Sequence, residues 1–182
     1  MDFRFRPAAQ PDVDAIVALV ESAYRGEPSR AGWTTEADLL DGRRTGAADV
    51  RACIDRPRSV ILLAEAPGRG IVGCAHVAEE DGGGYFGMFS VQPTLQGAGL
   101  GKQLLARAEQ TVFERWRLPV MRMTVIDVRD ELIAFYERRG YRRTGVHKPF
   151  PYGDERFGEP RRDDLRFEVL EKASTLSSTQ DT

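Results

Sequence analysis

The sequence VQPTLQGAGLGK, residues 91–102, decides the fold of this chain. The residues before it, YFGMFSV (85–91), have the composition of a β-strand. The residues after it, KQLLARAEQTVFERW (102–116), have the spacing of an amphipathic helix. Glycines between a strand end and a helix start leave backbone N–H groups unobstructed at the positive end of the helix dipole. The stretch therefore predicts an anion site, best suited to a phosphate.

The spacing of the glycines narrows the choice of phosphate ligand. A nucleotide P-loop requires Gly where Gln96 stands and Ser or Thr where Gln103 stands. The dinucleotide pattern G-x-G-x-x-G, started at Gly97, requires a third Gly at Lys102. The sequence matches neither nucleotide-binding pattern. Two interpretations remain: the loop binds another phosphate-containing ligand, or its glycines only allow the chain to turn.

Strand and helix patterns alternate on both sides of this stretch. Strands are predicted around residues 3–5, 59–66, 71–80, 118–126, 141–148 and 162–170, and helices after Pro11 and over 130–140. Weak helical pieces, broken by Gly and Pro, fill residues 25–58. The alternation predicts one α/β domain over residues 1–172, and the Ser/Thr-rich residues 173–182 are expected to be a disordered tail.

Two motifs in this order resemble a known family. Gln96-Gly97-Ala98-Gly99-Leu100-Gly101 matches the pattern Q/R-x-x-G-x-G/A, and residues 133–141, IAFYERRGY, look like the segment A-x-x-F-Y-x-x-x-G-F. Both belong to the GCN5-related N-acetyltransferases (GNAT). The resemblance implies the acyl-CoA N-acyltransferase fold: a mixed, mostly antiparallel central sheet of about six or seven strands flanked by helices. It also implies transfer of an acetyl group to a primary amine of a small molecule or peptide by direct attack.

The resemblance implies acetyl-CoA as co-substrate, with two groups of binding residues. The pyrophosphate would lie on the N–H groups of the loop formed by Gln96, Gly97, Ala98, Gly99, Leu100 and Gly101, with Lys102 adjacent. Pantetheine would pair with the edge formed by Phe89, Ser90 and Val91, where this strand splays from residues 121–126. A β-bulge is typical there, and Gly87 or Ser90 could accommodate it. The N–H near Val91 would then face the thioester carbonyl, where negative charge develops.

Tyr136 matches the family tyrosine that stands near the sulfur as general acid. A phenol with an ordinary pKa of about 10 can protonate a departing thiolate. The alternative is an aromatic side chain on the packed face of its helix. Arg129 stands where many relatives carry Asn, so the cofactor contact of that Asn is not transferred to this chain.

The sequence does not assign the general base. Glu65, Glu79, His76 and Asp127 are candidates on or just beyond predicted strands, and water-mediated deprotonation is equally compatible. Cys53 and Cys74 could in principle act as nucleophiles, but both are better explained as small buried hydrophobes.

The acceptor would lie between residues 24–36 and 148–162, by analogy with the same architecture. These segments hold aromatic and charged side chains: Tyr24, Arg25, Glu27, Arg30, Trp33, Glu36, Phe150, Tyr152, Asp154, Glu155, Arg156 and Phe157. Such a set suits a small polar amine or a peptide end, and it also suits an ordinary surface loop.

The amino-acid composition argues against several other functional classes of protein. The 182 residues carry 28 acidic and 26 basic side chains, a balance that disfavours nucleic-acid binding. No apolar run approaches the ~20 residues of a membrane span, and the first residues lack a signal-peptide core, so a cytoplasmic location is expected. Two Cys and two His do not favour a metal site. A homodimer is expected on general grounds, and a non-catalytic acyl-CoA sensor or partner-binding module is the alternative to an enzyme.

Overall fold

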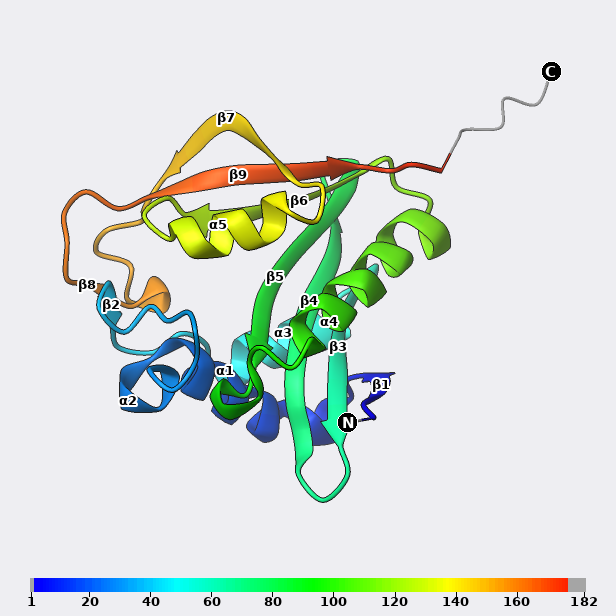
Figure 1. Cartoon of the computed structure of the whole chain (residues 1–182), viewed down its shortest axis with the longest axis horizontal. Helices are drawn as coiled ribbons and strands as arrows, with labels where there is room; N and C mark the ends of the chain where they lie inside the picture. The colour runs from blue at the N-terminus through cyan, green and yellow to red at the C-terminus, as the bar shows by residue number, and fades with distance from the viewer. Residues whose placement is uncertain (1, 177–182) are drawn as a thin grey trace.

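A seven-stranded sheet forms the centre of the protein. In the computed structural model, which describes residues 2–176, the strand order is β1-β3-β4-β5-β6-β9-β7 (Figure 1). Neighbouring strands are antiparallel except β5 and β6, which are parallel. The mixed, mostly antiparallel sheet predicted from the sequence is therefore confirmed.

The strands of this sheet are between 4 and 11 residues long. They are β1 (Arg4–Pro7), β3 (Ser59–Ala66), β4 (Gly70–Glu80), β5 (Gly83–Val91), β6 (Val120–Ile126), β7 (Arg142–Pro149) and β9 (Arg166–Ala173). A separate two-stranded sheet pairs β2 (Leu40–Asp41) with β8 (Glu159–Pro160). The helices are α1 (Val13–Tyr24), α2 (Gly26–Ser29), α3 (Ala47–Asp55), α4 (Leu100–Glu109) and α5 (Asp130–Glu137). Single turns of 3₁₀-helix cover Gln10–Asp12, Pro93–Leu95 and Glu155–Phe157.

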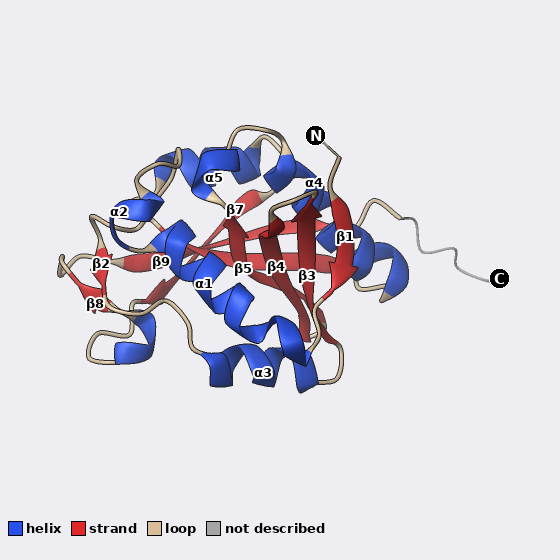
Figure 2. Ribbon diagram, turned by 90° about the horizontal axis from the view of Figure 1, so that it is seen from below, coloured by secondary structure: helices blue, strands red, loops and turns tan. Residues whose placement is uncertain are grey.

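The helices cover both faces of the sheet, as Figure 2 shows for α1 and α3 in front of β3, β4 and β5. Alternating side chains of β3 explain the two layers, because successive residues of a strand point to opposite faces. Leu63 packs with α1 and α3, whereas Ala64 packs beneath α4 with Leu100 and Leu104. Each face of the sheet thus packs against helices through a separate apolar cluster.

The parallel strands β5 and β6 separate soon after they meet. They pair only at Gly84 with Met121 and at Tyr85 with Arg122. Beyond this point the rest of β5 pairs with no described strand on that side. The result is an opening in the middle of the sheet, along the free edge of β5.

Several predicted elements differ in their bounds, two of them in ways that change the local structure. The helix predicted over 102–116 becomes a π-helical segment at Gln110–Arg115, where Trp116 N–H donates to Thr111 O. The last strand starts at Arg166 rather than 162, and it ends at Ala173, the first residue of the predicted tail. Residues 177–182 of that tail lie outside the described residues. The organisation of 1–172 as one domain stays a prediction.

Among residues 2–176, no helix combines the length and apolarity that crossing a membrane requires.

Candidate functional site

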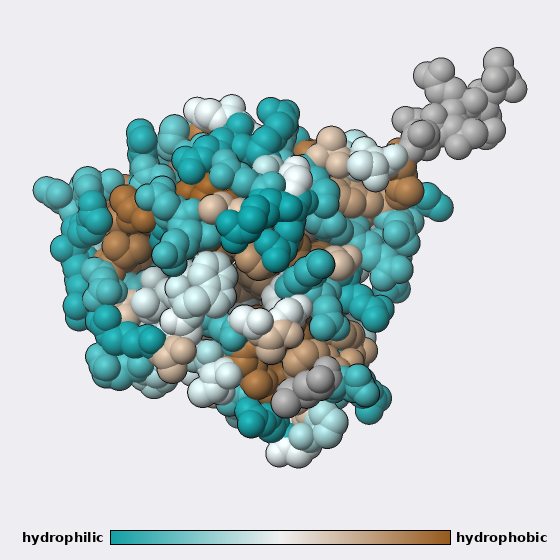
Figure 3. All heavy atoms as spheres, in the orientation of Figure 1, coloured by the Kyte–Doolittle hydropathy of each residue, from teal (hydrophilic) through white to brown (hydrophobic). Residues whose placement is uncertain are grey.

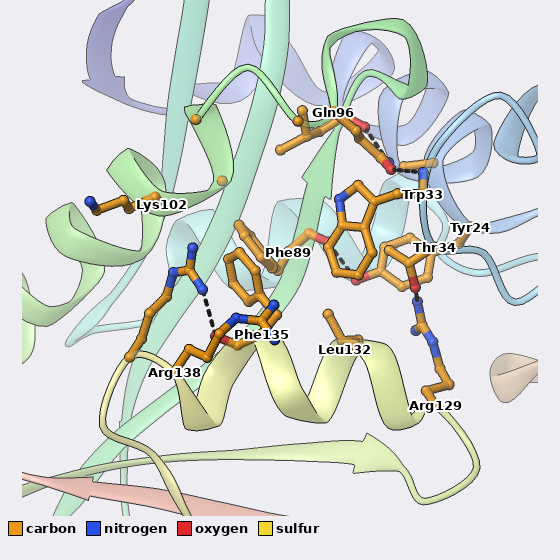
Figure 4. Close-up of a pocket in the computed structure, with 16 residues that line it drawn as sticks. Tyr24, Trp33, Thr34, Phe89, Gln96, Lys102, Arg129, Leu132, Phe135 and Arg138 are labelled. Atoms are coloured by element: carbon orange, nitrogen blue, oxygen red, sulfur yellow. Dashed lines mark hydrogen bonds between the residues drawn. The ribbon is translucent and has the colours of Figure 1, made fainter.

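A cavity of about 350 Å³ lies where the end of β5, the start of α4, helix α5 and the loop after α2 meet; we call it the donor cavity. Figure 4 shows Trp33, Phe89 and Phe135 in its middle, with Lys102 and Arg138 toward one end and Arg129 at the other. In the space-filling view, apolar atoms are visible between α4 and α5 within a mostly hydrophilic surface (Figure 3). The cavity therefore has an apolar middle and cationic ends.

The glycine loop forms the wall of the donor cavity at the start of α4. Gly97 and Gly99 have φ angles of +85° and +83°, a region that favours glycine. Among residues 2–176, the N–H groups of Gly97, Gly99, Leu100, Gly101 and Lys102 have no backbone or side-chain acceptor. Free amides at the start of a ten-residue helix, with Lys102 beside them, suit a phosphate group.

Seven of the ten predicted binding residues line the donor cavity: Phe89, Val91, Gln96, Gly97, Gly99, Gly101 and Lys102. The other three do not. Ser90 is buried and lies opposite Cys74 on β4, and the Leu100 side chain is buried in the core under α4. Ala98 is exposed at the tip of the loop. The Ala98 N–H donates to Leu95 O at 3.3 Å, so of these three residues only Leu100, through its backbone N–H, remains a candidate for binding a phosphate.

The edge of β5 faces the donor cavity. Phe89 O accepts a hydrogen bond from Tyr24 Oη at 2.5 Å, and Val91 O accepts one from Gln96 Nε2 at 3.2 Å. The register shift expected in this strand is present, but Met88, with φ of +49°, takes the left-handed conformation rather than Gly87 or Ser90. The bulge turns the end of β5 away from β6 and exposes its edge.

Several residues that line the donor cavity were not predicted as cofactor-binding residues. Arg138 and Arg139, at the end of α5, add positive charge beside Lys102. The Arg139 guanidinium lies 3.6 Å above the Phe135 ring. The ring centres of Trp33 and Phe135 lie 5.8 Å apart, although Trp33 comes from a distant loop that neither motif includes. In the sequence, the basic pair Arg138-Arg139, which closely follows Tyr136, could have indicated additional positive charge for binding the cofactor phosphates.

A second cavity, of about 150 Å³, occupies the opening between β5 and β6; we call it the acceptor cavity. It shares four lining residues with the donor cavity: Tyr24, Phe89, Arg129 and Leu132. Two molecules bound in the two cavities would therefore meet at the end of β5, next to the same side chains.

Tyr136 lines the acceptor cavity rather than the donor cavity. It is 4% exposed, and its ring packs against Phe86, Phe89 and Tyr141. Its hydroxyl makes no hydrogen bond to another described residue. Burial, strengthened by nearby Tyr24, raises the pKa of Tyr136 well above its ordinary value of 10. The phenol therefore stays protonated at neutral pH.

A buried ionic cluster forms one wall of the acceptor cavity. Glu36 accepts from Arg25 through Oε2 and from Arg129 through Oε1, the latter at 2.8 Å. Arg129 also donates to Thr34 Oγ1 at 2.8 Å. Burial opposes ionisation of Glu36, but Arg129, Arg44 and Arg25 together hold its pKa below the ordinary value of 4.5. Arg129, left without a role in the sequence, thus binds a buried carboxylate and lines both cavities.

None of the four candidate bases lines either cavity. Glu65 pairs with Arg6, Glu79 with Arg58, and Asp127 with Arg166. His76 Nε2 shares a hydrogen bond of 2.8 Å with Ser59 Oγ, and burial lowers the pKa of His76 to about 4. The side chains of these four residues are engaged in structural contacts, and none of them is part of the lining of either cavity.

The cysteines are also outside both cavities. Burial raises the pKa of Cys74 to about 12, and it raises the pKa of the half-buried Cys53. Neither thiol has the lowered pKa of a nucleophilic cysteine.

Some of the residues predicted to bind the acceptor line the acceptor cavity, and others do not. Tyr24, Arg25, Glu36, Phe150 and Phe157 line it. Trp33 lines the donor cavity instead, and the remaining candidates line neither: Glu27, Arg30, Tyr152, Asp154, Glu155 and Arg156. Arg44 lines the acceptor cavity and was not predicted, because nothing in its local sequence marks it.

Comparison with known proteins agrees with this geometry. The profile of the acetyltransferase (GNAT) family matches residues 17–141. A mycothiol acetyltransferase of Salinispora tropica is 29% identical over 157 residues, which cover 82% of this chain and 47% of that protein. A mycothiol acetyltransferase of Kineococcus radiotolerans is 34% identical over 114 residues, 61% of this chain and 33% of that protein. The chain thus spans about half the length, or less, of these curated relatives.

A solved structure shows the same fold over the whole chain. The ribosomal-protein-S18-alanine N-acetyltransferase from Escherichia coli superposes with a TM-score of 0.72 at 12% identity, covering 100% of this chain and 99% of the other. The profile covers well over half of the sequence, and it contains the glycine loop, β5 and Tyr136. This chain belongs to the GNAT family of acetyltransferases.

Proposed function

We propose that the chain transfers the acetyl group of acetyl-CoA to the amine of a small molecule or peptide, by direct attack within a ternary complex. One observation carries the proposal. The donor cavity, with its free amides at the start of α4, meets the acceptor cavity at the end of β5, where Tyr136 stands.

The donor cavity fits acetyl-CoA in three parts. The free N–H groups of the glycine loop and Lys102 would hold the pyrophosphate, and Arg138 and Arg139 add charge for further phosphate. The apolar middle, with Trp33 and Phe135, would hold the pantetheine chain along β5. The N–H of Val91 is our candidate donor to the thioester carbonyl, where negative charge develops during attack.

Tyr136 is our candidate general acid. In the reaction the amine nitrogen forms a bond to the carbonyl carbon, the carbon–sulfur bond breaks, and the sulfur takes the phenolic proton. The raised pKa keeps that proton on Tyr136 until the thiolate forms. The amine releases its own proton to water, since no described acid or histidine outside the ionic cluster lines the acceptor cavity.

The test has two readouts on the same protein. Calorimetry with acetyl-CoA measures binding, and free-thiol release across a panel of amines measures transfer. Lys102→Gln is expected to raise KM for acetyl-CoA about 2- to 5-fold, because an exposed ion pair contributes up to about 1 kcal/mol. Arg107→Gln, on α4 but outside the cavity lining, is the charge-matched control and should leave KM unchanged.

Two results would count against an enzyme of this kind. If acetyl-CoA binds but no amine releases thiol above background hydrolysis, the chain is a non-catalytic acyl-CoA-binding module. If ATP or NAD stabilises the protein against heat more than CoA does, the donor cavity serves a nucleotide instead. A homodimer and a cytoplasmic location stay predictions.

A further inference from the structure

The acceptor cavity carries an excess of positive charge. Its lining includes the guanidinium groups of Arg25, Arg44 and Arg129, and its one carboxylate among the described residues belongs to Glu36. Three cations against one anion leave two positive charges around a small cavity. Under the acetyl transfer proposed for this chain, that imbalance selects the class of acceptor.

Glu36 does not neutralise all three arginines. Each of its oxygens is bonded to one partner, Oε2 to Arg25 and Oε1 to Arg129. The three side chains are only 7–8% exposed. Even so, Arg25 Nε and Nη2 and Arg129 Nε are buried without a hydrogen-bond partner among the described residues. The cluster therefore retains unsatisfied donors within the protein interior.

Arg44 is the cation that remains unpaired. Its side chain makes no ion pair or hydrogen bond with any other residue in 2–176. Its backbone is fixed, since the N–H groups of Arg44 and Thr45 donate to Glu21 Oε1 at 2.6 and 2.9 Å. Its guanidinium lies 5.0 Å from the centre of the Tyr24 ring. Tyr24 in turn bonds to Phe89 O, so Arg44 is held close to the reacting end of β5.

The surroundings make an unpaired cation unfavourable. Apart from the cluster, the cavity wall is largely apolar and aromatic, with side chains such as Leu132, Val125, Phe86, Phe150 and Phe167. The half-buried Arg44 guanidinium is only partly hydrated there, and the nearby Glu36 charge and Tyr24 ring compensate it without a hydrogen-bonded counter-ion among the described residues. An anionic ligand would supply the missing partner.

We propose that the acceptor is an amine that also carries a carboxylate, and that Arg44 binds this carboxylate. A guanidinium matches a carboxylate with two parallel hydrogen bonds, which fixes its orientation. Because Arg44 lies close to the end of β5, the carboxylate and the reacting amine are a few bonds apart in the acceptor. A polyamine, with a second positive charge, is disfavoured in the same space.

The excess positive charge also acts on the reacting amine. Nearby cations disfavour an ammonium ion, so they lower the pKa of a bound amine. The amine is thus bound in the neutral, nucleophilic form. If the amine binds in its neutral form, the site needs no general base to deprotonate an ammonium ion. This agrees with the described lining, in which no carboxylate or histidine is free to act as a base.

The experiment compares amines that differ in one group. Glycine, β-alanine and alanine are each paired with their amides, and aminomethylphosphonate tests a different anion. Thiol release from acetyl-CoA gives kcat and KM for each. We expect kcat/KM to favour each carboxylate over its amide by about 10- to 100-fold, as hydrogen bonds to a charged group provide. A preference for the phosphonate over every carboxylate would overturn the assignment of the anion.

The variant Arg44→Gln should remove this preference. KM for the carboxylates is expected to rise at least about 10-fold, and by a larger factor than KM for the amides, which lack the group that Arg44 binds. Arg44→Lys should retain part of the preference, and Arg43→Gln, one residue away on an exposed side chain, should retain all of it. Equal use of acids and amides by the wild-type protein overturns the inference, whether or not Arg44→Gln folds.

A binding measurement separates this inference from the proposed function. N-acetylglycine and its amide are titrated into the CoA-bound protein by calorimetry. Tighter binding of the acid, lost in Arg44→Gln, supports the anion site even if no amine is turned over. Efficient acetylation of neutral amines, without such a difference, overturns the anion site and leaves the acetyltransferase proposal standing.

Discussion

Replacing Glu36 with Gln tests the ionic wall of the acceptor cavity. The substitution keeps the shape of the side chain and removes the charge that holds Arg25 and Arg129, all three being at most 8% exposed. Removing one partner of a buried ion pair leaves an uncompensated charge, which costs about 3–5 kcal/mol. For a domain of this size, each kcal/mol lowers Tm by about 2–4 °C. We therefore expect Glu36→Gln to lower Tm by about 6–20 °C, measured by differential scanning calorimetry.

The matched control is Glu27→Gln, which removes an exposed partner of Arg30. Its carboxylate is 89% exposed, so the loss should stay below about 1 kcal/mol. The pH dependence supplies a second check. The folded-state pKa of Glu36 lies below its ordinary value of 4.5, so its contribution is complete above pH 4.5 and is lost as pH falls toward the folded-state pKa. The gap in Tm between the wild type and Glu36→Gln should narrow below pH 4.5. Equal shifts for Glu36→Gln and Glu27→Gln would refute the reasoning.

Three further predictions address the general acid, the core and the thiols. Tyr136→Phe should lower kcat for thiol release by about 10²- to 10⁴-fold and leave Tm nearly unchanged, because the hydroxyl has no partner among residues 2–176; an unchanged kcat would exclude the acid role. Leu104→Ala, at a fully buried position between α4 and the sheet, should lower the free energy of unfolding in urea by about 2–5 kcal/mol, whereas Val146→Ala, at 55% exposure, should change it by less than about 0.5 kcal/mol. Iodoacetamide at a pH of about 8 should label Cys53 before Cys74, whose pKa of about 12 and complete burial protect it. Mass spectrometry of native and unfolded protein would show the order, and faster labelling of Cys74 would contradict its buried position.

The glycine-loop wall of the donor cavity was predictable because its residues are contiguous in sequence. The loop Gln96–Gly101 combines a strand end, glycines with positive φ and a helix start, and each of these features has a local signature. The same is true of helix α5, whose acidic start and following glycine fix its ends. The local sequence therefore determines where the free N–H groups at the start of α4 lie.

The acceptor cavity was less predictable, because distant segments build it. Glu36 and Arg129 are 93 residues apart, and no periodic pattern connects them. Arg44 stands in a segment with only weak helical signals, so its place in the wall depends on the packing of α1 and on Glu21. The β-bulge illustrates the same limit. Gly87 or Ser90 was expected to accommodate the bulge, but Met88 takes the left-handed conformation there.

The wall shared by the two cavities couples the binding of the two substrates. Tyr24, Phe89, Arg129 and Leu132 face both spaces. A ligand in one cavity that orders these side chains lowers the entropy lost when the second ligand binds. Thermodynamic linkage makes this effect reciprocal: the factor by which acetyl-CoA raises affinity for the acceptor equals the factor by which the acceptor raises affinity for acetyl-CoA. Tyr24, which donates a hydrogen bond to Phe89 O at the end of β5, is therefore one of the side chains through which the two binding equilibria are coupled.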